Sequence, residues 1–184
     1  MVLNMNMYEQ EVEHLIFKGI PIDGPLDEFV EKLKGYGYQY LYEENGDALM
    51  EGAFAGIGGC CIAISSIKGK NIVYIVGVLF PACEDWSTLE KDYIFLKTKL
   101  IEKYGEPSTV IERFTGCVQP EDNIEKLHEL YMDRCVWGTL FKIKNGDILL
   151  VLRKSLNGRG CYVVLKYFDK INTALVDSLV IDDL

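Results

Sequence analysis

The stretch YLYEENGDALMEGAF, residues 40–54, decides the fold expected for this chain. In it, Asn45, Gly46 and Asp47 separate two runs that are rich in aromatic and aliphatic residues. Asn-Gly is a strong hairpin signal, because a type I′ turn needs positive φ angles that these two residues adopt at low cost. The stretch therefore predicts two antiparallel strands, over residues 36–44 and 48–55, joined by a tight turn.

Further strands follow from the same reasoning along the chain. A second pair, Asn145-Gly146, predicts a hairpin of residues 134–144 and 147–154. Other β-rich runs predict strands over residues 13–18, 60–67, 72–80, 108–114 and 160–168. The run Ile72-Val73-Tyr74-Ile75-Val76 lacks polar alternation, which predicts a central strand that is covered on both faces.

Three helices are predicted from apolar spacing and from their end signals. Pro25 opens the first, which Gly35 ends. The second runs over residues 87–104, where Ser87 and Glu90 form a capping box. The third runs over residues 120–131 with three apolar side chains inward, namely Ile124, Leu127 and Tyr131.

The order of these elements predicts the fold class and a single domain. With 184 residues, 49% of them hydrophobic, the chain is long enough to bury a core without disulfides. We expect an α+β fold: a twisted antiparallel sheet built from hairpins, in two weakly repeated halves, with the helices packed on one face. The halves are residues 13–83 and 84–168, after a flexible acidic arm at 1–12 and before a C-terminal tail at 169–184.

Charge and hydropathy narrow the classes of partner. The net charge of −9 and the scattered basic residues argue against nucleic acid, which needs clustered Lys and Arg. An acidic surface instead suits a protein partner with a basic surface. The longest apolar run, residues 72–83, is too short to span a bilayer, and residues 1–8 lack the features of a secretory signal. The sequence therefore predicts a soluble, cytoplasmic protein of undetermined oligomeric state.

The six cysteines are predicted to be buried thiols. They are Cys60, Cys61, Cys83, Cys117, Cys135 and Cys161. A chain of this length without an export signal has little need of disulfides. No C-x-x-C pair occurs, and neighbouring residues of a strand point to opposite faces, which argues against a zinc site.

Few residues suggest catalysis. Cys135 with His128 is the one nucleophile and base that the sequence offers, but nothing places them together. The acidic turn at residues 43–47 does not match a calcium loop, and the glycine-rich residues 52–59 precede a strand where a phosphate loop would precede a helix. We therefore predict no catalytic residue, no metal ligand and no cofactor.

Aromatic residues are the better candidates for a binding surface. Four tyrosines alternate in the first predicted hairpin strand, namely Tyr36, Tyr38, Tyr40 and Tyr42, and Trp86 opens the second helix. Alternation in a strand puts all four tyrosines on one face. If that face is the core they are packing residues, and if it meets solvent they form a binding stripe. Both readings stay open.

Two segments carry a family resemblance. Residues 19–24 (GIPIDG) with Phe29 and Leu33, and the pattern from Trp86 through Tyr93 and Leu100 to Pro107, resemble a family of small α+β proteins from gut anaerobes. That family has no assigned activity, and its members often begin with an export signal, which implies an exported protein as the alternative location. The repeated unit of a helix and antiparallel strands is more distantly similar to the β-lactamase-inhibitor-like fold, whose members bind other proteins.

These observations lead to one functional hypothesis and two alternatives. The hypothesis is a non-enzymatic, protein-binding domain of the inhibitor-like or interaction type. The first alternative is a small-molecule hydrolase or metal-assisted enzyme that uses Cys135 and His128. The second is a ligand-binding module with a lipid-like molecule between the helices and the sheet.

Overall fold

A computed structural model describes residues 13–155 and 160–182. The N-terminal half begins with a short hairpin of β1 (Ile16–Phe17) and β2 (Ile20–Pro21), followed by helix α1 (Leu26–Gly35). Four strands come next: β3 (Gln39–Glu44), β4 (Asp47–Phe54), β5 (Ile57–Ile67) and β6 (Ile72–Leu79).

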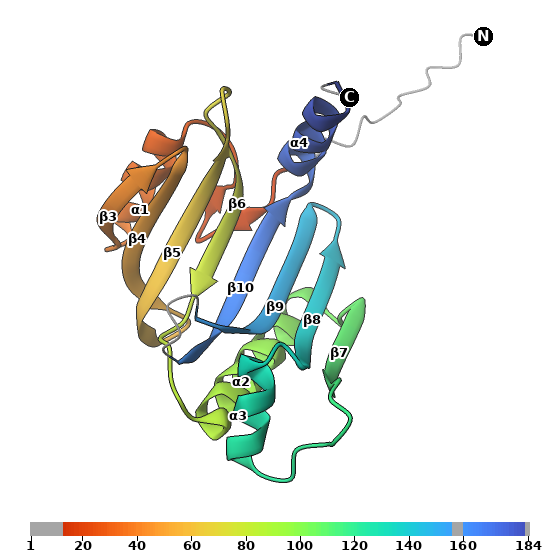
Figure 1. The fold of residues 1–184 in the computed structure, drawn as a ribbon. Coiled ribbons are helices and arrows are strands. Elements are labelled where there is room, and N and C mark those ends of the chain that lie inside the picture. Colours follow the sequence, from red (N-terminus) through yellow and green to blue (C-terminus); the bar gives the residue numbers. More distant parts are fainter. Residues whose placement is uncertain (1–12, 156–159, 183–184) are drawn as a thin grey trace, which may run out of the picture.

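The C-terminal half repeats the order of one helix followed by four strands, with a second helix inserted after the first strand (Figure 1). Helix α2 (Trp86–Tyr104) precedes β7 (Thr109–Phe114), and the inserted helix α3 (Asn123–Tyr131) separates β7 from β8 (Cys135–Ile143). Strands β9 (Gly146–Lys154) and β10 (Cys161–Asp169) then lead into α4 (Lys170–Asp182).

Strands β3 to β10 form one antiparallel sheet of eight strands in the order β3-β4-β5-β6-β10-β9-β8-β7. Each half contributes four neighbouring strands, and the halves meet where β6 pairs antiparallel with β10, from Ile75↔Phe168 to Leu79↔Val164. The predicted α+β class with an antiparallel sheet is confirmed. Because one sheet runs through both halves, the two halves share a single layer.

The two Asn-Gly pairs act differently. Asn45 and Gly46 have φ angles of 54° and 85°, as the predicted type I′ turn between β3 and β4 requires. In the second pair, Ile143 faces Gly146, so residues 144 and 145 form the loop and Gly146 begins β9. A Cβ on Gly146 would lie 2.1 Å from the carbonyl oxygen of Phe168. Glycine is needed there because β10 approaches closely, and not because of the turn.

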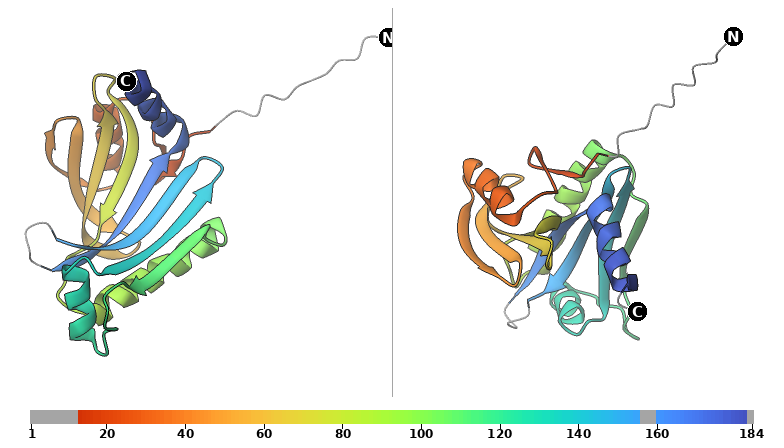
Figure 2. Two further views of the ribbon diagram at one scale, coloured as in Figure 1. Left: turned by 45° about the vertical axis from the view of Figure 1, so that its right-hand side comes forward. Right: turned by 90° about the horizontal axis from the view of Figure 1, so that it is seen from above.

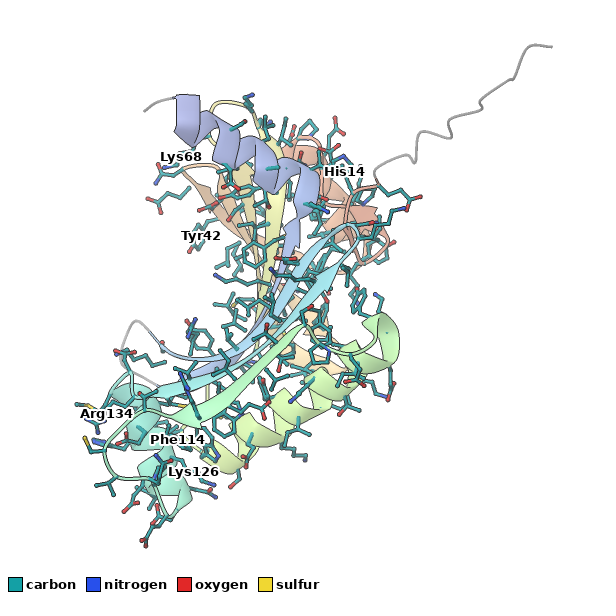
Figure 3. All side chains as sticks on the ribbon, turned by 90° about the vertical axis from the view of Figure 1, so that its right-hand side faces the viewer. His14, Tyr42, Lys68, Phe114, Lys126 and Arg134 are labelled. Carbon is teal, nitrogen blue, oxygen red and sulfur yellow. The ribbon has the colours of Figure 1, made fainter. Side chains whose placement is uncertain are left out.

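The core lies between one face of the sheet and helices α1 and α2 (Figure 2). The sheet gives every second residue to it, among them Met50, Ile62, Ile64, Val76, Val78, Leu150, Leu152, Val163 and Leu165. Helix α1 adds Phe29 and Leu33, and α2 adds Trp86 and Tyr93, all of them almost fully buried. Helix α3 packs beside α2 on this same side, where the side chain of Asn123 donates to Ser87 and Leu130 joins the core. Helix α4 lies at one end of the sheet on its other side, next to Lys142 and Phe168 (Figures 2 and 3).

Several local predictions are wrong. Residues 13–18 do not join the large sheet, because Lys18 and Gly19 turn the chain back with positive φ angles and close the β1–β2 hairpin. The cap of α2 is Asp85, whose carboxylate accepts the backbone N–H of Thr88, and not the predicted Ser87–Glu90 box. In α3, Ile124 is 80% exposed, and Leu130 is the buried residue.

The segment expected to be a C-terminal tail is part of the fold. Asn172 of α4 is buried, and its side-chain amide donates to the carbonyl oxygens of Ile22 (3.2 Å) and Val73 (3.0 Å) and to the carboxylate of Asp23 (2.9 Å). The predicted acidic arm, residues 1–12, lies outside the described residues.

A buried carboxylate joins the beginning of the described chain to its end. Asp169 has no exposed surface and accepts the backbone N–H groups of Leu15 (2.7 Å) and Asn172 (2.9 Å). Its Oδ2 lies 3.1 Å from Nδ1 of His14, whose Nε2 lies 3.4 Å from Asp23. Asp169 therefore caps α4 and holds the segment before β1 at the same point.

We predict that Asp169→Asn lowers the free energy of unfolding by about 2–3 kcal/mol, because one backbone N–H would then face an amide NH₂ group in the interior. The control is Asp177→Asn on the exposed side of α4, which should change stability by less than about 0.5 kcal/mol. Urea unfolding measures both. Equal, small effects would show that the Asp169 cluster does not hold these segments.

Candidate functional site: the open face of the sheet

Within residues 13–155 and 160–182, no helix layer covers one face of the large sheet. Residues opposite one another on paired strands share a face, so the register identifies its members. One row runs Glu51↔Cys61↔Leu79↔Val164↔Val151↔Gly138↔Ile111. A second runs Tyr42↔Leu49↔Ala63↔Gly77↔Lys166↔Leu149↔Leu140↔Thr109. We call the surface made by these rows, with Ser65, Ile75, Arg113, Arg153 and Tyr162 beside them, the open face.

The open face is concave, and α4 borders it at one end (Figure 3). Its centre, over the β6–β10 junction, is a hollow of about 400 Å³. The floor is apolar: Val151 and Val164 are 7% and 4% exposed, and Ile75, Leu79 and Leu149 are half-buried. The floor of the hollow is therefore apolar and only partly accessible to solvent.

The hollow exists because small residues occupy its middle. Ala63 and Ser65 of β5 line it beside Gly77 of β6. The backbone of Gly77 is not left-handed, and the nearest atom to an added Cβ would be the carbonyl oxygen of Ala63, at an ordinary 3.8 Å. Neither conformation nor packing requires this glycine, although glycine weakens a strand. The missing side chain therefore leaves the hollow open.

Charge is divided across the open face. Arg153 and Lys166 line the hollow and are exposed, and Arg113 lies farther along on β7. Within residues 13–155 and 160–182 none of these three cations forms an ion pair. At the opposite margin, β3 and β4 carry the exposed acids Glu44, Asp47 and Glu51. An acidic chain therefore presents free positive charge beside an apolar hollow.

The predicted tyrosine stripe is not a stripe. Tyr36 follows α1 as its C-cap, before β3 begins, and Tyr38 is buried with its hydroxyl donating to the carbonyl oxygen of Ala53. Tyr40 pairs with Met50 on the helix-covered side. A register shift between Tyr40 and Tyr42 then turns only Tyr42 to the open face, where it is labelled in Figure 3. The bulge and the late start of β3 break the expected alternation.

Trp86, the other aromatic candidate, is a core residue. Its side chain has no exposed surface and packs against Phe114 and Trp137, with ring centroids 5.5 Å and 5.2 Å away. As the first residue of α2 it faces the sheet, because the cap at Asp85 fixes the direction in which the helix starts. The structure therefore places Trp86 in the core and not on the open face.

The structure does not activate Cys135. Burial, reinforced by nearby Cys161, raises the pKa of the Cys135 thiol to about 12, whereas a nucleophilic cysteine needs a lowered pKa. His128 is an exposed residue of α3, and no hydrogen bond joins it to Cys135 in the part of the chain that the structure describes. The geometry of these two residues is that of a buried thiol and a surface imidazole.

The remaining candidate chemistry is equally sparse in the described residues. All six cysteines are free thiols: Cys60, Cys135 and Cys161 are buried, as predicted, but Cys61 and Cys83 are half-buried and Cys117 is exposed. Residues 13–155 and 160–182 contain no group of three His, Cys, Asp or Glu side chains placed to hold a metal ion. No helix in those ranges is long and apolar enough to cross a membrane.

Comparison with protein-family models, with curated proteins and with solved structures finds no match. The resemblances inferred from the sequence therefore stay predictions.

The open face was missed by sequence reasoning, although the run Ile72–Val76 contained its signal. Apolar residues on both sides of β6 were interpreted as two covered faces, whereas one of them meets solvent.

The thiols give a direct test of the Cys135 environment. In the folded protein at pH 8 we expect iodoacetamide to alkylate exposed Cys117 far faster than Cys135, because a thiol of pKa about 12 is ionised in roughly one molecule in ten thousand. In urea all six should react at similar rates. Peptide mass spectrometry follows each site, and rapid alkylation of Cys135 in the folded protein would restore the nucleophile hypothesis.

Proposed function

We propose that this protein is a non-enzymatic binding domain whose open face docks a partner protein. The observation that carries the proposal is the hollow over the β6–β10 junction, kept open by a glycine that neither conformation nor packing requires. Selection for stability alone would fill such a position, since a strand glycine costs about 0.5–1 kcal/mol. A docking surface that receives a partner side chain explains the vacant space.

The chemistry of the open face defines the partner. An apolar floor suits an aromatic or large aliphatic side chain, which fills a pocket at the centre of many interfaces. The exposed cations Arg153 and Lys166 at the rim suit carboxylates next to that side chain. The net charge of the whole chain favours a basic partner, but the local charge beside the hollow favours an acidic one. Contacts at the hollow depend on the local charge, because distant charges are screened by salt.

Two further observations support a binding role. The order of one helix and four strands in each half agrees with the distant resemblance to the β-lactamase-inhibitor-like fold, which by itself is a weak argument for function. The layer between the helices and the sheet is occupied by large, fully buried side chains such as Phe29, Trp86 and Tyr93. This filled layer favours a ligand on the open face over a lipid-like molecule in the interior.

A side chain that fills the hollow should change stability and partner binding in opposite directions. Gly77→Val should raise the free energy of unfolding by about 0.5–1 kcal/mol, through β-propensity and reduced freedom of the unfolded chain. The same variant should lose the partner that the immobilised wild-type protein captures stoichiometrically from an extract of its own cells. The matched control is Gly58→Val in β5, another strand glycine with open space around it. It should keep the partner, whereas equal capture by both variants would contradict the proposal.

Charge reversal tests the predicted acidity of the partner. The double variant Arg153→Glu, Lys166→Glu should weaken binding at least about tenfold at low salt. The effect should be smaller at high salt, because salt screens the same charges. The control reverses two exposed lysines of the covered side, Lys32 of α1 and Lys91 of α2. Binding isotherms at two salt concentrations measure both. Tighter binding of the Arg153, Lys166 variant would identify a basic partner in place of an acidic one.

A further inference from the structure

The two edges of the large sheet differ in how well they can accept another strand. Strand β3 forms one edge and carries the register shift between Tyr40 and Tyr42, and such bulges hinder edge-to-edge pairing. Strand β7 forms the other edge and pairs with β8 over six consecutive residues without a shift. In residues 13–155 and 160–182 no strand pairs with the outer side of β7. An exposed, regular edge of this length is a template for another strand.

We propose that β7 pairs antiparallel with β7 of a second copy of this chain, so that two sheets join into one of sixteen strands across a two-fold axis. The strand sequence TVIERF has one acidic and one basic residue, which permits self-pairing. Facing residues must lie on the same face of the joined sheet, so the possible registers centre on a single residue. This limits the choice to a few arrangements.

Charge and length select the register centred on Ile111. It places Ile111 opposite itself, Val110 opposite Glu112 and Thr109 opposite Arg113, so no like charges face each other. A register centred on Glu112 would set two carboxylates directly opposite, which is destabilising. A register centred on Val110 avoids that conflict but pairs fewer residues of β7. The Ile111 register is therefore the longest one without repulsion.

An apolar flank beside the edge adds to the interface. Val110 pairs with Thr139, whose hydroxyl bonds to Tyr93 of α2, so Val110 lies on the α2 side of the sheet. Lys97 of α2 bonds to Glu112 of β7 at 2.6 Å, and Ile94 lies one helical turn before Lys97 on the same flank. Ile94 and Val110 are 55% and 43% exposed. A two-fold axis brings this flank toward the same flank of the second copy.

The two-fold axis of such a joined sheet is perpendicular to it, so both open faces lie on the same side. If the proposed function holds, the dimer presents two docking surfaces in one direction, which suits a partner that is itself dimeric or repeated. The pairing through β7 does not depend on that function.

Sedimentation velocity of the full chain tests the dimer. Wild type should sediment as a dimer at micromolar concentration. Val110→Glu should shift it to a monomer with unchanged circular dichroism, because position 110 faces Glu112 of the second copy and two carboxylates would then lie opposite each other. The matched control is Leu41→Glu on the β3 edge, since Leu41 and Val110 are both 43% exposed, and it should stay dimeric. A monomeric wild type up to sub-millimolar concentration, or dissociation by Leu41→Glu in place of Val110→Glu, would overturn the proposal.

Two further variants test the register of the dimer and whether dimerisation is independent of the proposed function. In a Cys117→Ser background, Ile111→Cys should form a disulfide to its counterpart when diamide is added, and cross-linking through Glu112→Cys alone would overturn the register. Gly77→Val should dimerise as the wild type does, although it loses the partner. A wild-type dimer that captures no partner, or a Gly77→Val dimer that still captures it, would contradict the proposed function and leave the β7 pairing intact.

Discussion

The pairing of β6 with β10 is the contact on which the rest of the structure depends. Five residue pairs, from Ile75↔Phe168 to Leu79↔Val164, join the two four-strand halves within the sheet, and the isolated bridge Cys83↔Cys161 continues this pairing. Because this pairing is antiparallel and central, it fixes the relative orientation of the halves, and α1 and α2 come to lie on the same side. It also places Gly77 of one half against Lys166 of the other, so the hollow of the open face exists only when the junction is formed.

The two faces of the large sheet contribute differently to stability and to binding. On the covered face, large side chains of α1 and α2 exclude water and provide the stability of the fold. On the open face, the same strands carry smaller apolar residues, with free arginine and lysine side chains at the rim. Part of the apolar surface of that second face stays accessible to solvent, so it contributes less to the stability of the fold than full burial would. A partner that buries this surface would gain affinity from it, and the domain itself would not need to change.

Local sequence predicts much of the fold, but it predicts the candidate site poorly. Asn45-Gly46 specified the β3–β4 turn because the required φ angles are a property of those two residues. The tyrosine stripe failed because a single register shift, which depends on tertiary packing, reversed the side chains after Tyr40. The apolar run of β6 revealed a central strand, but whether helices cover both faces depends on where α4 goes after β10. Sequence periodicity reports apolar faces and not what lies against them.

The long separation along the chain between β6 and β10 has a consequence for synthesis. When a nascent chain has reached Leu79, the N-terminal half holds four strands and α1 but presents β6 as a bare edge. The strand that covers this edge, β10, emerges from the ribosome only after the whole C-terminal half up to Asp169. Closure of the sheet is thus a late, nonlocal and slow event. In the interval, β10 of a neighbouring polypeptide can occupy the place, so we expect misassembly of this protein to proceed by exchange of halves between chains.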